Sequence, residues 1–175
     1  MAQVRREGLS LISNGITKRP DGSEVPPVVD IIFVHGLNGH PENTWRGETG
    51  RPSGEKAKRS CNIMKFWSKK RETVSQKVFW PHVFLREDIK NARIFTYGYN
   101  ANVAEGFLKG SNQNNIYNHG RDLAAKFQRE LGEDNHYPII FVVHSLGGII
   151  VKDAIHQSRF LRERTKLVVF FGTPH

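Results

Sequence analysis

Cysteine is nearly absent from this sequence: among 175 residues the only one is Cys61. A single thiol cannot form an internal disulfide, and no CxxC or Cys/His spacing surrounds it. Neither the disulfide framework of a small secreted protein nor a zinc site is therefore supported. We expect no metal and no other cofactor, and we interpret Cys61 as an ordinary thiol in a loop.

Long apolar runs are absent as well. No stretch approaches the roughly 18 uninterrupted apolar residues of a membrane-spanning helix, and the N-terminal MAQVRREGLS lacks the apolar core of a signal peptide. The phosphate-binding patterns GxGxxG and GxxxxGK followed by Ser or Thr do not occur, so no nucleotide site is expected. These absences predict an intracellular protein that is not secreted.

Positive charge is in excess, with a formal net charge of +9 at pH 7. Much of it lies between Arg46 and Lys77, where ten Lys and Arg residues stand against three Glu. This basic insertion has two interpretations: it binds the head groups of an anionic membrane surface, or it is only a solvated loop. Nucleic acid is not expected as a partner, because the neighbouring aromatic residues of FWPHVFL (79–85) are expected to pack in the core.

Four short apolar runs alternate with segments of helical periodicity. The runs are rich in β-branched and aromatic residues and end in Gly, Ser, Asn or Pro, which is typical of strands buried on both faces of a parallel sheet. The helical segments are NIYNHGRDLAAKFQRELGED and GGIIVKDAIHQSRF. The alternation of strand and helix predicts the α/β class. The four runs are VVDIIFVHGLNG (28–39), ARIFTYGYN (92–100), YPIIFVVHS (137–145) and KLVVFFGTPH (166–175).

The chain length suits one domain of this class. Residues 1–27 are expected to form an N-terminal strand at GLSLIS and a turn-rich connector, KRPDGSEVPP, without regular structure. Residues 28–175 then form the α/β domain, which carries the basic insertion at about 46–77. The strand at 166–173 is the last in the sequence, and as an unpaired edge it would favour self-association or the binding of a protein partner.

Ser145 lies in HSLGG, directly after the third apolar run, where the carboxyl end of a parallel strand is expected. A strand-to-helix turn that exposes a nucleophilic serine needs small neighbours. Gly147 and Gly148 follow, although Val143 stands where the GxSxG pattern has its first glycine. Ser145 is therefore a candidate nucleophile at a helix N-terminus, where free N–H groups stabilise negative charge. The alternative is that Ser145 only caps that helix.

HGLNG, after the first apolar run, favours the catalytic interpretation. An oxyanion hole at such a site takes one N–H from the residue after the nucleophile, here Leu146, and another from the loop after an earlier strand, here Leu37. His35 and Gly36 are expected to shape that loop; alternatively, His35 is only a buried, hydrogen-bonded core residue. Tyr99 ends another strand nearby, and it either lines the site or belongs to the core.

With these motifs in this order, the sequence resembles the α/β hydrolase superfamily. It is most similar there to lipase-like or esterase-like domains related to the serine active site containing protein family, and to the N-terminal hydrolase-like domains of fungal NLR-type proteins. The resemblance covers roughly residues 28–175. It is carried by DIIFVHGLNGHPENTW, FWPHVFLREDIKNARIFTYGYNANV, FVVHSLGGIIVKDAI and LVVFFGTPH.

The resemblance implies a serine hydrolase fold that lacks its last strands. Ser145 matches the nucleophile of such domains, and Leu37 and Leu146 match the oxyanion donors. The implied substrate is an ester or a lipid, with a role in lipid metabolism or in signalling. The implied location is cytoplasmic, or peripheral to the mitochondrial or endoplasmic reticulum membrane.

The sequence offers no complete set of partners for Ser145. A serine hydroxyl needs a histidine as base and a carboxylate to orient it, in the chain order Ser, Asp or Glu, His. Asp153 lies about 12 Å along the predicted helix, at 1.5 Å per residue, which is too far. His175 is the candidate base, although GTPH also matches a structural loop. Two interpretations stay open: a serine-dependent acyl ester hydrolase, and a catalytically inactive interaction or signalling module.

Overall fold

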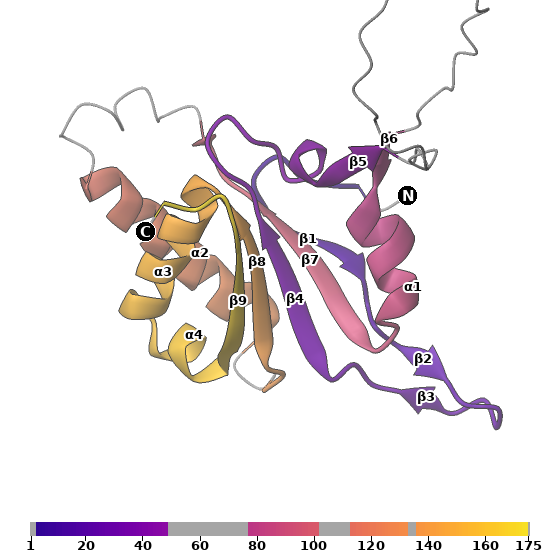
Figure 1. Cartoon of the computed structure of the whole chain (residues 1–175). Coiled ribbons are helices and arrows are strands. Elements are labelled where there is room, and N and C mark those ends of the chain that lie inside the picture. Colours follow the sequence, from indigo (N-terminus) through magenta and orange to yellow (C-terminus); the bar gives the residue numbers. More distant parts are fainter. Residues whose placement is uncertain (1–2, 49–76, 102–112, 133–135, 175) are drawn as a thin grey trace, which may run out of the picture.

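The apolar runs form the strands of a mixed, mostly parallel sheet. The computed structural model describes residues 3–48, 77–101, 113–132 and 136–174. The sheet strands in these ranges are β1 (Gly8–Ser13), β4 (Val29–Val34), β7 (Ala92–Gly98), β8 (Ile139–His144) and β9 (Thr165–Phe171). They are hydrogen-bonded in the order β1-β7-β4-β8-β9, and β1 alone among these five runs antiparallel to its neighbour (Figure 1). The predicted α/β class with a mostly parallel sheet is confirmed.

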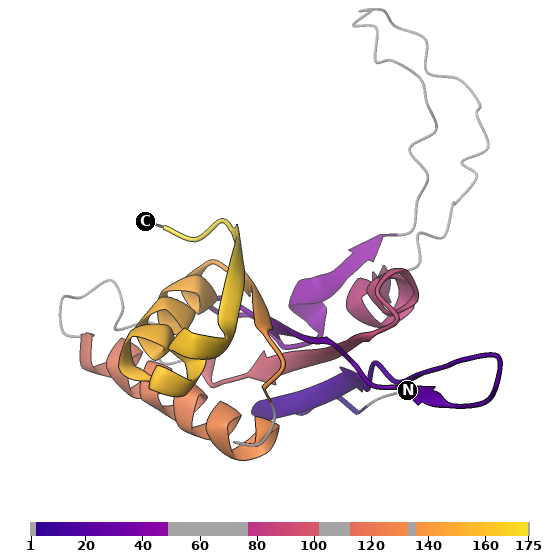
Figure 2. The same ribbon diagram turned by 90° about the horizontal axis from the view of Figure 1, so that it is seen from below.

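Helices lie on both faces of this sheet. One face is covered by α2 (Gln113–Leu131), α3 (Leu146–Gln157) and α4 (Arg159–Arg164) (Figures 1 and 2). The other face is partly covered by a π-helical turn, η2 (Pro81–Leu85), which continues into α1 (Arg86–Asp88). The second predicted helix is thus divided in two by Ser158, whose hydroxyl accepts the N–H of Leu161 and caps α4.

The sheet separates two apolar clusters. Leu123 and Phe127 of α2 pack against Phe141 of β8 in the cluster on the α2 and α3 side. On the other side, Phe33 of β4 has edge-to-face contacts with Trp45 and Trp80, at ring-centroid distances of 5.0 and 5.2 Å. Strands that contribute to both clusters are apolar at nearly every position, which explains why they appear in the sequence as continuous runs.

Two further pairs of antiparallel strands lie outside the main sheet in the described residues. β2 (Thr17–Lys18) pairs antiparallel with β3 (Glu24–Val25), so the prediction that KRPDGSEVPP has no regular structure is wrong at the ends of that stretch. β5 (Arg46–Glu48) pairs antiparallel with β6 (Lys77–Phe79), which brings the two ends of the basic insertion side by side. The rest of the insertion, interpreted above as a solvated loop or a membrane-binding segment, lies at 49–76, outside the described residues.

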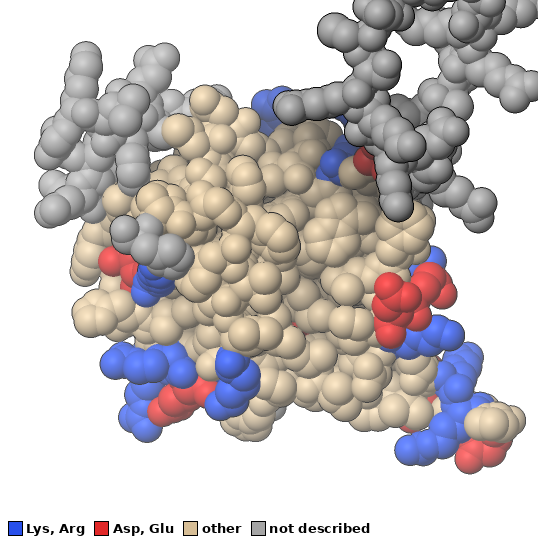
Figure 3. All heavy atoms as spheres, viewed as in Figure 1, with Lys and Arg blue, Asp and Glu red and all other residues tan. Residues whose placement is uncertain are grey.

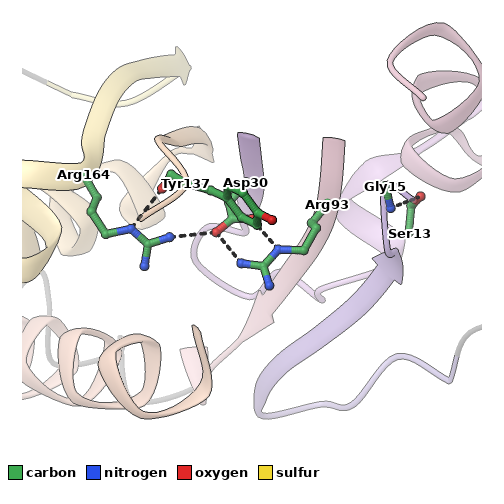
Figure 4. A network of polar contacts seen from close by, with 6 residues as sticks. All are labelled: Ser13, Gly15, Asp30, Arg93, Tyr137 and Arg164. Carbon is green, nitrogen blue, oxygen red and sulfur yellow. Dashed lines mark hydrogen bonds and ion pairs between the residues drawn. The ribbon is translucent and has the colours of Figure 1, made fainter. Parts of the chain in front are cut away.

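A buried ion network joins the strands at the end of the sheet where β4 begins. The Asp30 carboxylate is fully buried and accepts two hydrogen bonds from Arg93, at 2.6 and 2.7 Å, and one from Arg164, at 3.0 Å (Figure 4). Arg164 also donates to the carbonyl oxygen of Tyr137, and its guanidinium lies 4.7 Å from the ring centre of Phe160. The network ties β4, β7 and α4 together at the end of the sheet opposite the carboxyl ends of the parallel strands.

β9 forms an edge of the sheet within the described residues, because it pairs only with β8 there. Leu167 and Phe171 of this strand are 51% and 48% exposed. The face of the molecule shown in Figure 3 carries its charged side chains near the rim, over α4 and the β2–β3 hairpin, and few over the middle. None of the helices in the described ranges combines the length and apolar character that crossing a bilayer requires.

Candidate functional site

The carboxyl ends of the parallel strands meet at one edge of the sheet. Val34 of β4 lies in register with Tyr97 of β7 on one side and with Val143 of β8 on the other. His144, the last residue of β8, lies in register with Phe171 of β9. The loops that follow these strands therefore start at the same level, which is where ligands bind in α/β sheets.

Ser145 occupies the turn between β8 and α3, with φ 50° and ψ −123°. A left-handed φ is unfavourable for a residue with a Cβ atom, and such a conformation costs about 1–3 kcal/mol. Ser145 takes the N-cap position of α3, but its side chain accepts no hydrogen bond from the first turn. A capping role therefore does not account for the serine.

Backbone strain in the described residues is concentrated at this edge. Apart from glycines, two described residues have a positive φ: Ser145 and Asn38, which lies in the loop after β4. Strained conformations persist only where the surrounding structure holds them, and they cluster at functional sites. This concentration is an independent reason to place the candidate site here.

Glycines bring the loop after β4 into direct contact with the Ser145 turn. A Cβ atom on Gly36 would lie 2.7 Å from the Cβ of Ser145, and one on Gly147 would lie 2.7 Å from the carbonyl oxygen of Val34 and would overlap that of His35. Any side chain at either position would push the two segments apart. The structure thus brings together His35, Gly36, Ser145 and Gly147.

The two predicted oxyanion donors flank these contacts along the chain. Leu37 follows Gly36 and is 42% exposed, whereas Leu146 follows Ser145 and is buried at the start of α3. The Leu146 N–H is the first amide of α3, a position where an N–H has no partner within the helix and favours negative charge. The role of both residues as oxyanion donors stays a prediction.

His35 is a buried, hydrogen-bonded residue that shapes the loop. Its Nδ1 lies 2.9 Å from the carbonyl oxygen of Gly36, its Nε2 accepts the N–H of Tyr99 at 3.4 Å, and its ring stacks on that of Tyr99 at 4.4 Å. These contacts fit a neutral ring with the proton on Nδ1. Burial lowers the pKa of His35, opposed by the bond to Gly36, and the nearby His40 and His144 lower it further.

Tyr99 supports the same loop rather than pointing toward Ser145. Its hydroxyl donates to the carbonyl oxygen of His35 at 3.0 Å, and burial raises its pKa. A pocket of about 350 Å³ opens next to it, lined by Asn38, His40 and Asn100 among others, and Ser145 is not part of this lining. Tyr99 therefore holds the loop after β4 in place through its contacts with His35.

The structure assigns other contacts to the acids and histidines near Ser145. Asp153 binds Gln157 one turn along α3 and faces Gly120 of α2. His144 is exposed, and its ring centre lies 6.4 Å from that of Trp45, on the face opposite α3. Within the described ranges, the Ser145 hydroxyl has no hydrogen-bonded histidine. His175, the candidate base, lies outside those ranges.

Sequence patterns missed the segment that holds the backbone of Ser145. The N–H of Ser145 donates to the carbonyl oxygen of Phe171 at 2.9 Å, and the Thr173 hydroxyl donates to the carbonyl oxygen of Ser145 at 3.0 Å. The only signal in the sequence was the position of GTPH directly after the neighbouring strand. That position places Thr173 at the correct edge but not in contact with the serine.

Comparison with known proteins finds similarity to Protein SERAC1. The chain is 28% identical to the Danio rerio protein over 163 residues, which is 86% of this chain and 22% of the relative. It is 24% identical over 157 residues to the proteins of Mus musculus and Homo sapiens, with the same shares covered. No family model matches the chain, and no solved structure matches it significantly.

These relatives support a distant relationship to a serine-active-site-containing protein. The chain spans about a fifth of the length of the curated relatives it matches. The similarity is consistent with a hydrolase-like character. The finer assignments, to the α/β hydrolase superfamily and to the domains of fungal NLR-type proteins, stay predictions.

Proposed function

We propose that this chain is a serine-dependent acyl ester hydrolase domain of the α/β hydrolase type, with Ser145 as its nucleophile. The observation that carries the proposal is the conformation of Ser145: a strained, non-capping serine at a strand-to-helix turn, held against the loop after β4 by Gly36 and Gly147. A turn of this kind presents the serine hydroxyl at the helix N-terminus. The similarity to SERAC1 adds support from an independent direction.

The proposed reaction has two steps. In the first, Ser145 Oγ attacks the ester carbonyl carbon, its proton passes to a base, and the alcohol leaves with that proton as an acyl-serine forms. In the second, the base takes a proton from water as its oxygen attacks the acyl carbon; the bond to Oγ then breaks, Oγ receives the proton from the base, and the carboxylic acid is released. The negative oxygen of each tetrahedral intermediate would accept the N–H groups of Leu146 and Leu37.

The Ser145 hydroxyl needs a base that takes its proton. His175 lies four residues after the last residue of β9, and we propose it as the group that accepts the proton from Ser145. A second function, an interaction or signalling module without catalytic activity, is favoured by one observation: no described histidine is hydrogen-bonded to the Ser145 hydroxyl. Without a base, the oxyanion hole alone leaves only a small residual acceleration.

Labelling by a fluorophosphonate probe distinguishes the two functions. The purified 175-residue chain should be labelled at Ser145 and should hydrolyse a p-nitrophenyl ester, and Ser145→Ala should abolish both. His175→Gln should slow labelling strongly if His175 is the base. A folded wild-type chain that is not labelled would exclude the hydrolase and leave the interaction module.

Ser158→Ala is the matched control for Ser145→Ala. Ser158 caps α4 through its hydroxyl, so its loss should lower the free energy of unfolding by about 1 kcal/mol. Labelling of Ser145 should be unchanged, because α4 does not carry the proposed site. Cooperative thermal unfolding of every variant establishes that it is folded before labelling is compared.

The basic insertion and the edge of β9 bear on where the chain would act and what it would bind. We propose that the enzyme acts on an ester or lipid substrate in the cell, in the cytoplasm or at a mitochondrial or endoplasmic reticulum membrane. The basic insertion from Arg46 to Lys77 would supply contacts to anionic head groups, and the exposed edge of β9 would supply contacts to a protein partner. Sedimentation with phosphatidylserine vesicles, compared with neutral vesicles, tests the membrane contact.

A further inference from the structure

The backbone of Ser145 is held on both sides by the last residue of β9 and the segment that follows it. The Ser145 N–H donates to the carbonyl oxygen of Phe171 at 2.9 Å, and the Ser145 carbonyl oxygen accepts the Thr173 hydroxyl at 3.0 Å. The same carbonyl also accepts the N–H of Gly148 at 3.1 Å. Of these three contacts, the bond from Thr173 is the one that a side chain makes and that a substitution can remove.

The Thr173 side chain occupies the space that the absence of a side chain at Gly148 leaves open. A Cβ atom on Gly148 would lie 2.6 Å from Thr173 Cγ2 and would overlap Oγ1. Thr173 is 8% exposed, so its hydroxyl is shielded from competing water. The threonine therefore occupies a defined position between the first turn of α3 and the end of β9.

This contact determines how one particular peptide group is oriented. The carbonyl of Ser145 and the N–H of Leu146 belong to the same planar peptide unit, so fixing one of them fixes the direction of the other. The Leu146 N–H is the oxyanion donor of the proposed function. A bond from Thr173 to the Ser145 carbonyl thus controls the direction of a group that would bind the reacting oxygen.

We propose that Thr173 is a positioning residue for the Ser145 turn. Its hydroxyl holds the Ser145–Leu146 peptide so that the Leu146 N–H faces the site, and the strained φ of Ser145 is maintained by the paired contacts of Phe171 and Thr173. This inference rests on the proposed function for its effect on catalysis. The hydrogen bond itself and its effect on backbone order can be measured whether or not the chain is active.

The test compares Thr173→Val, which keeps the shape and removes the hydroxyl, with Thr173→Ser, which keeps the hydroxyl. Thr165→Val is the matched control, because the Thr165 hydroxyl makes a similar bond far from the site: it donates to the carbonyl oxygen of Leu161 at 2.7 Å.

For fluorophosphonate labelling, Thr173→Val should lower the maximal labelling rate constant at least about tenfold, short of the 10²–10³-fold loss of a whole oxyanion donor. The probe concentration at half-maximal rate should not change. Thr173→Ser should stay within about twofold of wild type, and Thr165→Val should label at the wild-type rate.

Amide hydrogen exchange supplies a readout that does not depend on activity. The amides of Ser145 and Gly148, which donate to the carbonyl oxygens of Phe171 and Ser145, should exchange at least about tenfold faster in Thr173→Val than in wild type, with Thr173→Ser and Thr165→Val close to wild type. Wild-type labelling in Thr173→Val, or equal losses in the Val and Ser variants, would overturn the inference. If wild type itself is not labelled, the proposed function fails, and the exchange rates alone decide the role of Thr173: unchanged rates in Thr173→Val overturn it.

Discussion

Gly147 packs directly against the carbonyl oxygen of His35, with no room for a Cβ atom between them. Helix propensity alone predicts that Gly147→Ala stabilises α3 by about 1 kcal/mol. The contact predicts the opposite, because the obstacle is backbone and cannot rotate away. We expect Gly147→Ala to lower the free energy of unfolding by about 2 kcal/mol, measured by urea denaturation.

Gly47→Ala is the control for this substitution. A Cβ atom at Gly47 would meet only the ring of Trp80, at an ordinary distance of 4.0 Å. Its free energy of unfolding should stay within about 0.5 kcal/mol of wild type, as is usual for substitutions away from tight contacts. If Gly147→Ala were as stable as Gly47→Ala, the close packing of the loop after β4 against α3 would be refuted.

Ser145→Gly should be more stable than Ser145→Ala. The positive φ of Ser145 is unfavourable because of its Cβ atom, and glycine removes that atom at the cost of greater freedom in the unfolded state. We expect Ser145→Gly to raise the free energy of unfolding by about 1 kcal/mol relative to Ser145→Ala, which keeps the Cβ. Thermal melts of the two variants measure the difference, and identical stabilities would mean that the turn is not strained.

Most of the sheet could be predicted from local patterns. The four apolar runs correspond to β4, β7, β8 and β9, because a strand buried on both faces must be apolar at consecutive positions. The position of Ser145 followed from the same pattern, since a serine between an apolar run and a glycine pair marks a strand-to-helix turn. The contacts of Gly36 and Gly147 could be expected once that turn was placed.

Contacts between distant segments could not be predicted in this way. The β5–β6 pair joins residues on either side of the basic insertion, and the Thr173 bond spans 28 residues, so no periodicity marks either one. Asp30 was visible as one charge within an apolar run, yet its two partners lie far along the chain. Such pairs depend on the register of neighbouring strands, which the sequence of one strand does not contain.

His35 should make stability depend on pH in the weakly acidic range. Burial lowers the pKa of His35 in the folded chain below its ordinary value of 6.5, so on acidification the unfolded chain takes up the proton first. The contribution of His35 to the free energy of unfolding is therefore fully present above about pH 6.5. Below that pH it decreases, by up to about 1.4 kcal/mol per pH unit. Urea denaturation from pH 7.5 to 5.0 should show a shallower loss for His35→Gln, which cannot titrate, and equal slopes would contradict the assignment.

Removing Asp30 should cost far more than removing Arg164, although the two form one ion pair. Asp30→Asn leaves Arg93 and Arg164 without a buried counter-charge, and the loss of one partner of a buried pair costs about 3–5 kcal/mol. Arg164→Met leaves Asp30 with both of its bonds from Arg93. Burial, with a further contribution from the charge of Arg93, lowers the pKa of Arg164 despite the opposing effect of Asp30, so the charge of Arg164 is held at a net cost. We therefore expect Arg164→Met to lose only about 1 kcal/mol, and urea denaturation at pH 7 should rank the two variants in this order. Equal losses would show that the three residues act as one indivisible unit rather than as an Asp30–Arg93 pair with a weaker third member.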